Sequence, residues 1–148
     1  MPIRVWNTLT DKKEELRPIR DGEVGIYVCG ITVYDLCHIG HARMLTAFDT
    51  LVRFLRWNGL RVKYVRNWTD VDDKIIRRAG ERGIDPVALA EEFIGEAKKD
   101  MASLNILEAD VEPRATQHIR EMHEIIGKLI DRGLAYPHQG DVLSLIHI

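Results

Sequence analysis

The sequence predicts an α/β fold in which a parallel strand–helix–strand unit is followed by further helices. Residues 24–28 are apolar and rich in β-branched side chains, as in a short buried strand, and residues 60–66 alternate apolar and basic side chains, as in a second strand. Between them, apolar residues recur over 39–58 at the spacing of an amphipathic helix. This order forms a βαβ unit, whose strands run parallel and whose crossover is right-handed.

The composition is that of an ordinary globular protein. The 148 residues are 45% hydrophobic and 30% charged, which excludes a disordered chain, a collagen-like fibre and a disulfide scaffold. The net charge of −2 means that contact with nucleic acid would need a local basic patch. Two cysteines fit a reduced compartment, and no apolar run approaches the ~20 residues of a membrane span. We therefore expect a cytoplasmic protein with no membrane partner.

The segments around the βαβ unit follow in order. Residues 1–23 are polar and rich in turns, and Asp21-Gly22 forms a turn before the first strand. Residues 29–38 have no helical period and exceed the ~2–6 residues of a usual βα connection, which indicates a working loop. Gly59 ends the helix 39–58 in the left-handed conformation. We expect the site beyond the carboxyl ends of the strands, where the long loop lies.

The rest of the chain reads as helical. Residues 70–78 form a short helix, and Asp85-Pro86 starts another, whose buried stripe is Ala90, Phe93, Ile94, Ala97, Met101 and Leu104. Pro113 opens a last helix that Gly133 closes, with a buried stripe of Ile119, Met122, Ile125, Ile126, Leu129 and Ile130. Two parallel strands are too few for a stable sheet, so the α/β core looks incomplete.

Two histidines at the start of the helix 39–58 are the first candidates for chemistry. His38 and His41 are three residues apart and share one face, and Gly40 between them keeps the first turn open. Amides at a helix amino terminus attract phosphate, and two imidazoles add donors for an oxygen that gains charge. An isolated His-x-x-His pair is more often two surface histidines, so the pair alone does not establish a site.

The amino-acid sequences of four separated segments are more specific than this histidine pair alone. His38-Ile39-Gly40-His41 is the HIGH signature of class I aminoacyl-tRNA synthetases. Together with residues 27–35, 64–74 and 112–116, it resembles cysteinyl-tRNA synthetases. The resemblance runs in register from residue 3 to about residue 142. It implies a partial Rossmann-like class I catalytic domain over 1–142, with the HIGH helix in its βαβ unit and helices appended.

The resemblance implies a cysteine-tRNA ligase. Its substrates would be ATP with magnesium, L-cysteine and tRNA-Cys, and it would be a monomer. His38 and His41 would be the catalytic residues, and the nucleotide and amino-acid sites would be shaped by Gly30, Thr32, Gly40 and Thr69. The family's second nucleotide motif, a Lys-Met-Ser-Lys-Ser loop, does not occur in the chain, so we expect this fragment to be inactive alone.

Cys29 is the candidate metal ligand. A free cysteine after a buried strand usually serves packing, but the resemblance implies that Cys29 is the first ligand of a zinc ion that binds the substrate thiolate. The remaining ligands would lie in a later segment of the family's sequence. The resemblance gives Cys37 no role, and a local site that combines Cys29, Cys37, His38 and His41 matches no known zinc spacing.

Acidic and basic residues near the second strand allow two interpretations each. Asp70, Asp72 and Asp73 form a helix amino terminus in the simpler interpretation and a magnesium site in the other. A locally basic stretch forms a solvated surface in the simpler interpretation and contacts the tRNA acceptor end in the other. Its residues are Arg43, Arg53, Arg56, Arg61, Lys63 and Arg66.

Two alternatives to the tRNA ligase remain open: the related cysteine ligase of mycothiol biosynthesis, and a non-catalytic nucleotide-binding module. Residues 143–148 form a separate expectation. These six residues match the translation of a sequencing-adapter end, and they begin where the family resemblance stops. We therefore expect 143–148 to be a non-native tail. The opposing interpretation is a genuine short strand, which the apolar alternation also suits.

Overall fold

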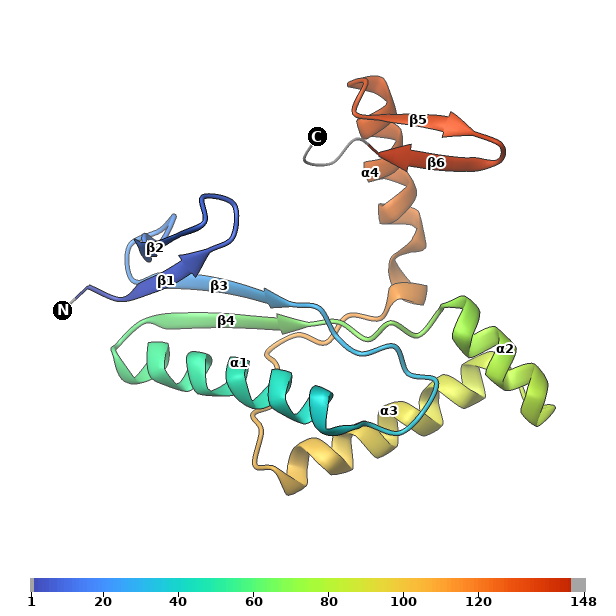
Figure 1. The fold of residues 1–148 in the computed structure, drawn as a ribbon, viewed down its shortest axis with the longest axis horizontal. Helices are drawn as coiled ribbons and strands as arrows, with labels where there is room; N and C mark the ends of the chain where they lie inside the picture. The colour runs from blue at the N-terminus through green and yellow to red at the C-terminus, as the bar shows by residue number, and fades with distance from the viewer. Residues whose placement is uncertain (1, 145–148) are drawn as a thin grey trace.

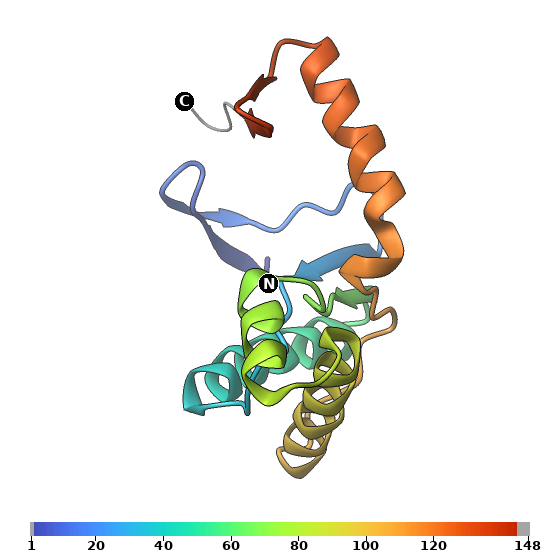
Figure 2. The same ribbon diagram turned by 90° about the vertical axis from the view of Figure 1, so that its right-hand side faces the viewer.

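The computed structural model describes residues 2–144, as a βαβ layer with helices packed on one side and an arm that extends from the other (Figures 1 and 2). Its elements are β1 (Arg4–Asn7), β2 (Lys12–Glu15), β3 (Glu23–Val28), α1 (Ile39–Trp57), β4 (Arg61–Arg66), α2 (Asp73–Arg82), α3 (Pro86–Ser103), the 3₁₀ helix η1 (Ala115–His118), α4 (Ile119–Asp131), β5 (Ala135–His138) and β6 (Asp141–Ser144). Of the predicted non-native tail, residues 143–144 end β6, and residues 145–148 lie outside the described residues.

The predicted βαβ unit is confirmed. Strands β3 and β4 pair in parallel, with Val24 opposite Val62 and Val28 opposite Arg66. Helix α1 connects them and lies along β4 (Figure 1). It ends before Gly59, whose φ of +82° is the left-handed conformation that a residue without a Cβ adopts easily.

A third segment extends this sheet beyond the two expected strands. Residues 111–114 run along the free edge of β4, where the Arg66 amide donates to the Val111 carbonyl at 3.1 Å and the Trp68 amide donates to the Pro113 carbonyl at 2.8 Å. Pro113 therefore belongs to an extended segment, and the prediction that it opens a helix is wrong. The α-helix begins at Ile119, after η1. Proline has no amide to donate, and here its carbonyl alone makes the sheet contact.

The main core lies between the loop after β3, the loop after β4, and helices α2 and α3. Val33, Trp68, Ile75 and Leu89 are at most 2% exposed in this cluster. The stripe predicted for α3 is buried from Ala90 to Met101, and Leu89 joins it. Leu104 is an exception at 49% exposed, because it is the C-cap residue, where the helix ends.

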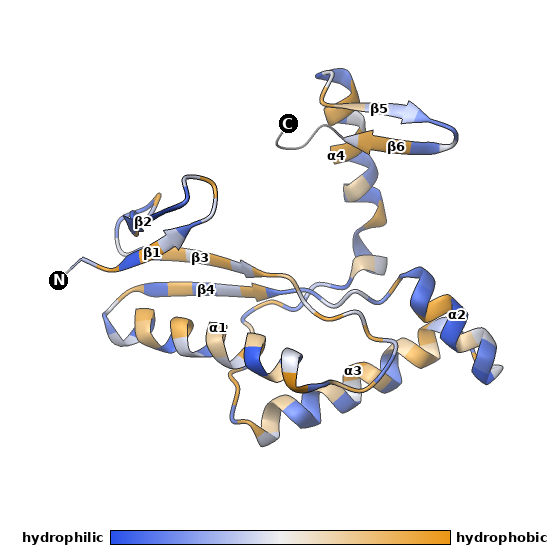
Figure 3. Cartoon of the chain, viewed as in Figure 1, coloured by the Kyte–Doolittle hydropathy of each residue, from blue (hydrophilic) through white to orange (hydrophobic). Residues whose placement is uncertain are grey.

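Helix α4 and the β5–β6 hairpin form the arm, and they depart most from expectation. The predicted buried stripe of α4 is wrong: no residue of α4 is buried, and the exposed ones include Ile119, Met122, Ile125 and Ile126. Figure 3 shows apolar residues along this helix, whose contacts within residues 2–144 include η1 and β5 of the hairpin. The apolar period correctly predicted a helix, but a period cannot tell whether the described chain buries the apolar face.

Polar sequence at the amino terminus also forms strands that the sequence did not predict. Strands β1 and β2 pair as an antiparallel hairpin, with Arg4 opposite Glu15. Apolar alternation is weak there, and Trp6 remains 59% exposed, so the usual sign of a half-buried strand is missing. Among the helices within residues 2–144, none is both long and apolar enough to cross a bilayer.

Candidate active site

The first turn of α1 is built by the two histidines of the HIGH signature. His38 is the N-cap residue, and its Nδ1 accepts a hydrogen bond from the Gly40 amide at 3.0 Å. His41 reaches back, and its Nδ1 accepts from the His38 amide at 3.2 Å. This reciprocal arrangement is a capping box in which imidazoles replace the usual hydroxyl and carboxylate.

These hydrogen bonds fix the tautomer of both rings. A nitrogen that accepts from a main-chain amide carries no proton, so a neutral imidazole in this position has its proton on Nε2. His38 and His41 therefore each present an Nε2–H donor, and their ring centroids lie only 4.0 Å apart. Burial, and then the nearby His38, lower the pKa of His41 below its ordinary value, which favours the neutral donor form. The pair is suited to stabilise oxygens that gain negative charge.

Gly40 is required by the His38 ring. A Cβ at position 40 would lie 2.7 Å from Cε1 and 2.9 Å from Nδ1 of His38. The sequence suggested that this glycine leaves the main-chain amides open to a ligand. The Gly40 amide is instead occupied by His38, so the donors that this turn offers are the imidazoles.

The residues predicted to shape the substrate pocket meet where the strands end. Thr32 and Thr69 are paired residues of a short parallel bridge beyond β3 and β4. The Thr69 amide donates to the Ile31 carbonyl at 3.2 Å. Gly30 lies so close to the next chain that a Cβ there would be 1.5 Å from the Asn67 carbonyl oxygen, a position that only glycine can occupy.

Asn67 is the residue that sequence reasoning left without a role. Its Oδ1 accepts from the Gly30 amide at 2.8 Å, and its Nδ2 donates to Thr69 Oγ1 at 3.2 Å. Its position directly after the second strand does predict a place at the mouth of the expected site, but no local pattern indicates the two partners of its amide.

Cys29 follows β3 directly and is exposed. Within residues 2–144, no three His, Cys, Asp or Glu side chains come together as a metal-binding group. The described residues therefore do not assemble a local zinc site from Cys29, Cys37, His38 and His41.

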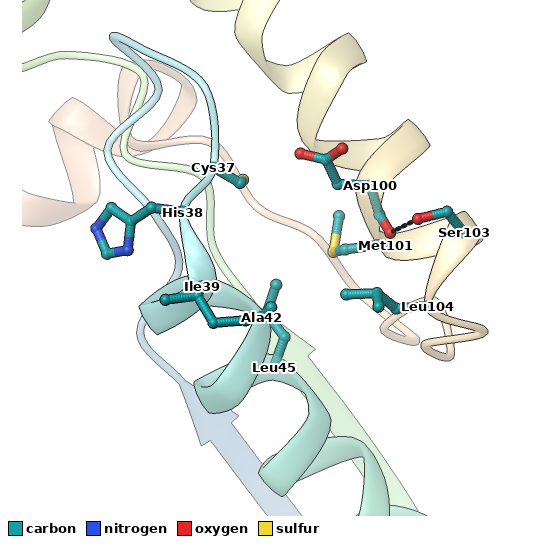
Figure 4. A pocket seen from close by; sticks show the side chains of 9 residues that line it. All are labelled: Cys37, His38, Ile39, Ala42, Leu45, Asp100, Met101, Ser103 and Leu104. Atoms are coloured by element: carbon teal, nitrogen blue, oxygen red, sulfur yellow. Dashed lines mark hydrogen bonds between the residues drawn. The ribbon is translucent and has the colours of Figure 1, made fainter.

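Cys37 and His38 line a cavity of about 280 Å³ between the start of α1 and α3 (Figure 4). The Cys37 side chain points towards Asp100 on α3, whereas the His38 ring points away from that helix. Burial, and then the Asp100 carboxylate, raise the pKa of the Cys37 thiol. Cys37 is partly buried and packs against the main core cluster, so it serves packing here.

The acidic residues after β4 have different structural roles. Asp72 is the N-cap of α2, where its Oδ1 accepts from the Lys74 amide at 2.8 Å, and Asp73 is the first residue of the helix. Asp70 is 7% exposed, and its two carboxylate oxygens accept from the amide and the hydroxyl of Thr116 at 3.0 and 2.6 Å. The simpler interpretation of the acidic run is therefore confirmed for Asp72 and Asp73 but not for Asp70, because α2 begins three residues later than the predicted 70–78 helix.

Most of the basic stretch is paired within the fold. Ion pairs join Arg53 to Asp49, Arg56 to Asp110, Arg61 to Glu23, and Arg66 to Glu112. Arg66 is only 2% exposed, so its assignment to a solvated edge is wrong. Glu112 holds it in place and also accepts from Trp68 Nε1 at 3.2 Å.

Known proteins resemble this chain in sequence over most of its length. A family profile described as "tRNA synthetases class I (C) catalytic domain" matches residues 15–146. The chain is 58% identical over 134 residues to a cysteine--tRNA ligase of Thermodesulfovibrio yellowstonii, and 55% identical over 147 residues to one of Desulfotalea psychrophila. These matches cover 90% and 99% of the chain but only 28% and 30% of the relatives. The chain thus spans less than a third of the length of these curated relatives.

A solved structure shares the fold. The methionyl-tRNA synthetase of Mycobacterium tuberculosis, in complex with methionyl-adenylate, superposes with a TM-score of 0.65 at 20% sequence identity. The superposition covers 83% of this chain and 29% of that one. At this identity the likeness concerns the arrangement of strands and helices.

Proposed function

Since the chain belongs to the family of class I (C) tRNA synthetase catalytic domains, we propose that it forms the ATP- and cysteine-binding part of a cysteine--tRNA ligase. The substrates are ATP with magnesium, L-cysteine and tRNA-Cys. The observation that carries the proposal is the His38–His41 pair, whose two Nε2–H donors lie beyond the ends of parallel strands in a βαβ unit. Residues 1–142 are the proposed extent of this part, with 143–148 as a non-native tail.

In the proposed first step, a carboxylate oxygen of cysteine attacks the α-phosphorus of ATP. The bond from that phosphorus to the bridging oxygen breaks, and pyrophosphate leaves with the electron pair. Negative charge then grows on the phosphate oxygens, where the donors of His38 and His41 stabilise it without having to reorient. In the second step, a ribose hydroxyl at the 3′ end of the tRNA attacks the acyl carbon, AMP leaves with the electron pair of the broken bond, and the hydroxyl proton is released.

The amino-acid pocket is proposed to form around the ends of β3 and β4. Gly30, Thr32 and Gly40 shape its floor and the nucleotide site, and Thr69 forms a wall. The Thr32–Thr69 bridge supports this proposal, because it brings the two loops together at the end of the sheet where class I sites lie.

Zinc binding at Cys29 is a separate proposal. Catalytic zinc sites use three protein ligands, and the described residues provide only the Cys29 thiol at this position. Residues 2–144 therefore do not make a zinc site by themselves. If Cys29 is a ligand whose partners lie elsewhere in the polypeptide, zinc retention by the protein from the complete gene drops in Cys29→Ser and not in Cys37→Ser.

A cytoplasmic monomer is proposed for the whole protein. Two free cysteines, one exposed and one half-buried, suit a reducing compartment. Light scattering on the protein expressed from its complete gene tests the oligomeric state.

Three assays on the protein from the complete gene distinguish this function from its alternatives. The proposal predicts cysteine-dependent ATP–pyrophosphate exchange together with cysteinylation of tRNA-Cys. Exchange without tRNA charging, but with transfer of cysteine to an amino-sugar acceptor, would assign the mycothiol-type ligase. ATP binding without exchange would assign a nucleotide-binding module.

A further inference from the structure

Asn67 lies where the parallel strands give way to the loops of the proposed pocket. Its side chain is half-buried, and both ends of its amide are engaged. The carbonyl end accepts from the Gly30 amide at 2.8 Å, and the amino end donates to Thr69 Oγ1 at 3.2 Å. One side chain therefore connects the main chain after β3 to a hydroxyl after β4.

The surrounding backbone is arranged to permit this contact. The absence of a Cβ at Gly30 lets the Asn67 carbonyl approach to a distance that any other residue would block. On the other side, the Trp68 amide donates to Pro113 at 2.8 Å, and the Trp68 carbonyl accepts from Ala115 at 3.1 Å. Because the flanking chain is held in this way, the Asn67 side chain has a defined place from which to act.

We propose that Asn67 is a positioning residue for the amino-acid substrate: it holds the Cys29–Gly30 peptide and the Thr69 hydroxyl in one fixed relation. The inference rests on the proposed function, which places Cys29 and Thr69 at the pocket. Asn67 acts through these neighbours and does not itself have to contact the substrate. Without its amide, the Gly30 N–H loses its partner, and the Thr69 side chain loses the contact that sets its rotamer.

This role predicts a selective kinetic defect. The His38–His41 pair is held by hydrogen bonds within its own helical turn, so its geometry does not depend on Asn67. Loss of the Asn67 amide should therefore weaken binding of cysteine and leave binding of ATP nearly unchanged. A general loss of folding would affect both substrates alike.

The test compares Asn67→Ala with Asn7→Ala in cysteine-dependent ATP–pyrophosphate exchange by the protein from the complete gene. Asn7 is a matched control, because its amide also bonds at both ends, to Glu14 and to the Leu9 amide, but within the β1–β2 hairpin. We expect Asn67→Ala to raise the KM for cysteine about tenfold or more, with less than a twofold change in the KM for ATP, as for a lost orienting contact. Asn7→Ala should leave both values unchanged.

Asn67→Leu keeps the test valid if the alanine variant does not fold. This change keeps a side chain of similar shape and removes both hydrogen bonds of the amide, so it too should raise the KM for cysteine selectively. If the wild type is active and both KM values move together, or neither moves, Asn67 is not a positioning residue. If the wild type shows no cysteine-dependent exchange, the proposed function fails and this inference fails with it.

Discussion

His41 holds the main chain of His38: the His41 imidazole accepts from the His38 amide, while the His38 imidazole accepts from the amide of Gly40 between the two histidines. In the proposed function, the same two rings therefore serve both capping and catalysis. The Nδ1 atoms stabilise the start of α1, and the Nε2 atoms remain available for a substrate oxygen. A substitution in this turn should affect both the helix start and the chemistry.

Gly40→Ala separates the role of this turn from ordinary helix propensity. Alanine at an open helical position stabilises by about 0.5–1 kcal/mol relative to glycine, and we expect this for Gly95→Ala, where a Cβ meets nothing within 4 Å. At Gly40 the new Cβ would press against the His38 ring, so we expect destabilisation by about 1 kcal/mol through loss of the cap. Thermal unfolding of the two variants measures this difference in stability. Equal stabilisation by both substitutions would contradict the predicted clash at Gly40.

Gly30→Ala tests the close contact between the two loops. The added Cβ would overlap the Asn67 carbonyl, which is main chain and cannot rotate away, so the strand ends must separate. We expect a loss of more than about 2 kcal/mol in the free energy of unfolding, in the range of severe overpacking. Gly25→Ala is the matched control, because a Cβ on that residue of β3 meets nothing within 4 Å. Denaturant unfolding should show little change in the control.

Glu112→Ala tests the buried ion pair at the edge of β4. The change leaves the Arg66 guanidinium, whose side chain is 3% exposed, without its carboxylate. Removal of one partner of a buried pair costs about 3–5 kcal/mol, because the remaining charge stays desolvated. The Arg82–Glu92 pair is partly exposed, so Glu92→Ala should cost less than about 1 kcal/mol. Similar losses in chemical denaturation of the two variants would mean that Arg66 finds other partners.

His41 makes the stability of the helix start depend on pH. Burial and His38 lower its pKa in the folded state, so below about pH 6.5 the unfolded chain binds more protons at this site than the folded one. The free energy contributed by His41 is thus fully present above pH 6.5 and is lost as the pH falls through the lowered pKa.

An NMR titration of the His41 ring should accordingly give a midpoint below 6.5. The part of the pH dependence that arises from this site should disappear in His41→Gln and persist in His123→Gln, a change on the exposed α4. A His41 midpoint at or above 6.5 would contradict the assigned environment.

The sequence predicted the parts of the fold whose partners are close in the chain. The apolar period of α1, the left-handed Gly59 and the Asp85–Pro86 start of α3 are local signals, and each is confirmed. The extended segment 111–114 was missed because its pairing with β4 is a contact across more than forty positions that no local pattern records.

For the candidate site, spacing singled out His38 and His41, the family resemblance gave them a role, and the structure adds how the two rings are held. Sequence alone could not show that their Nδ1 atoms accept main-chain hydrogen bonds, or that Gly30 and Gly40 are needed for space. Asn67 was missed for the same reason, because its role depends on two partners that only the folded chain brings together.

The most direct measurement of the central claim is cysteine-dependent ATP–pyrophosphate exchange by the protein from the complete gene, with His38→Asn and His41→Asn compared with His123→Asn. Loss of one preorganised donor to a transition state lowers kcat by about 10²–10³-fold. We expect a loss of this size in each HIGH variant, and wild-type activity in His123→Asn, whose residue lies on the exposed α4. Exchange at the wild-type rate in both HIGH variants would contradict the assignment of this histidine pair to the activation of cysteine.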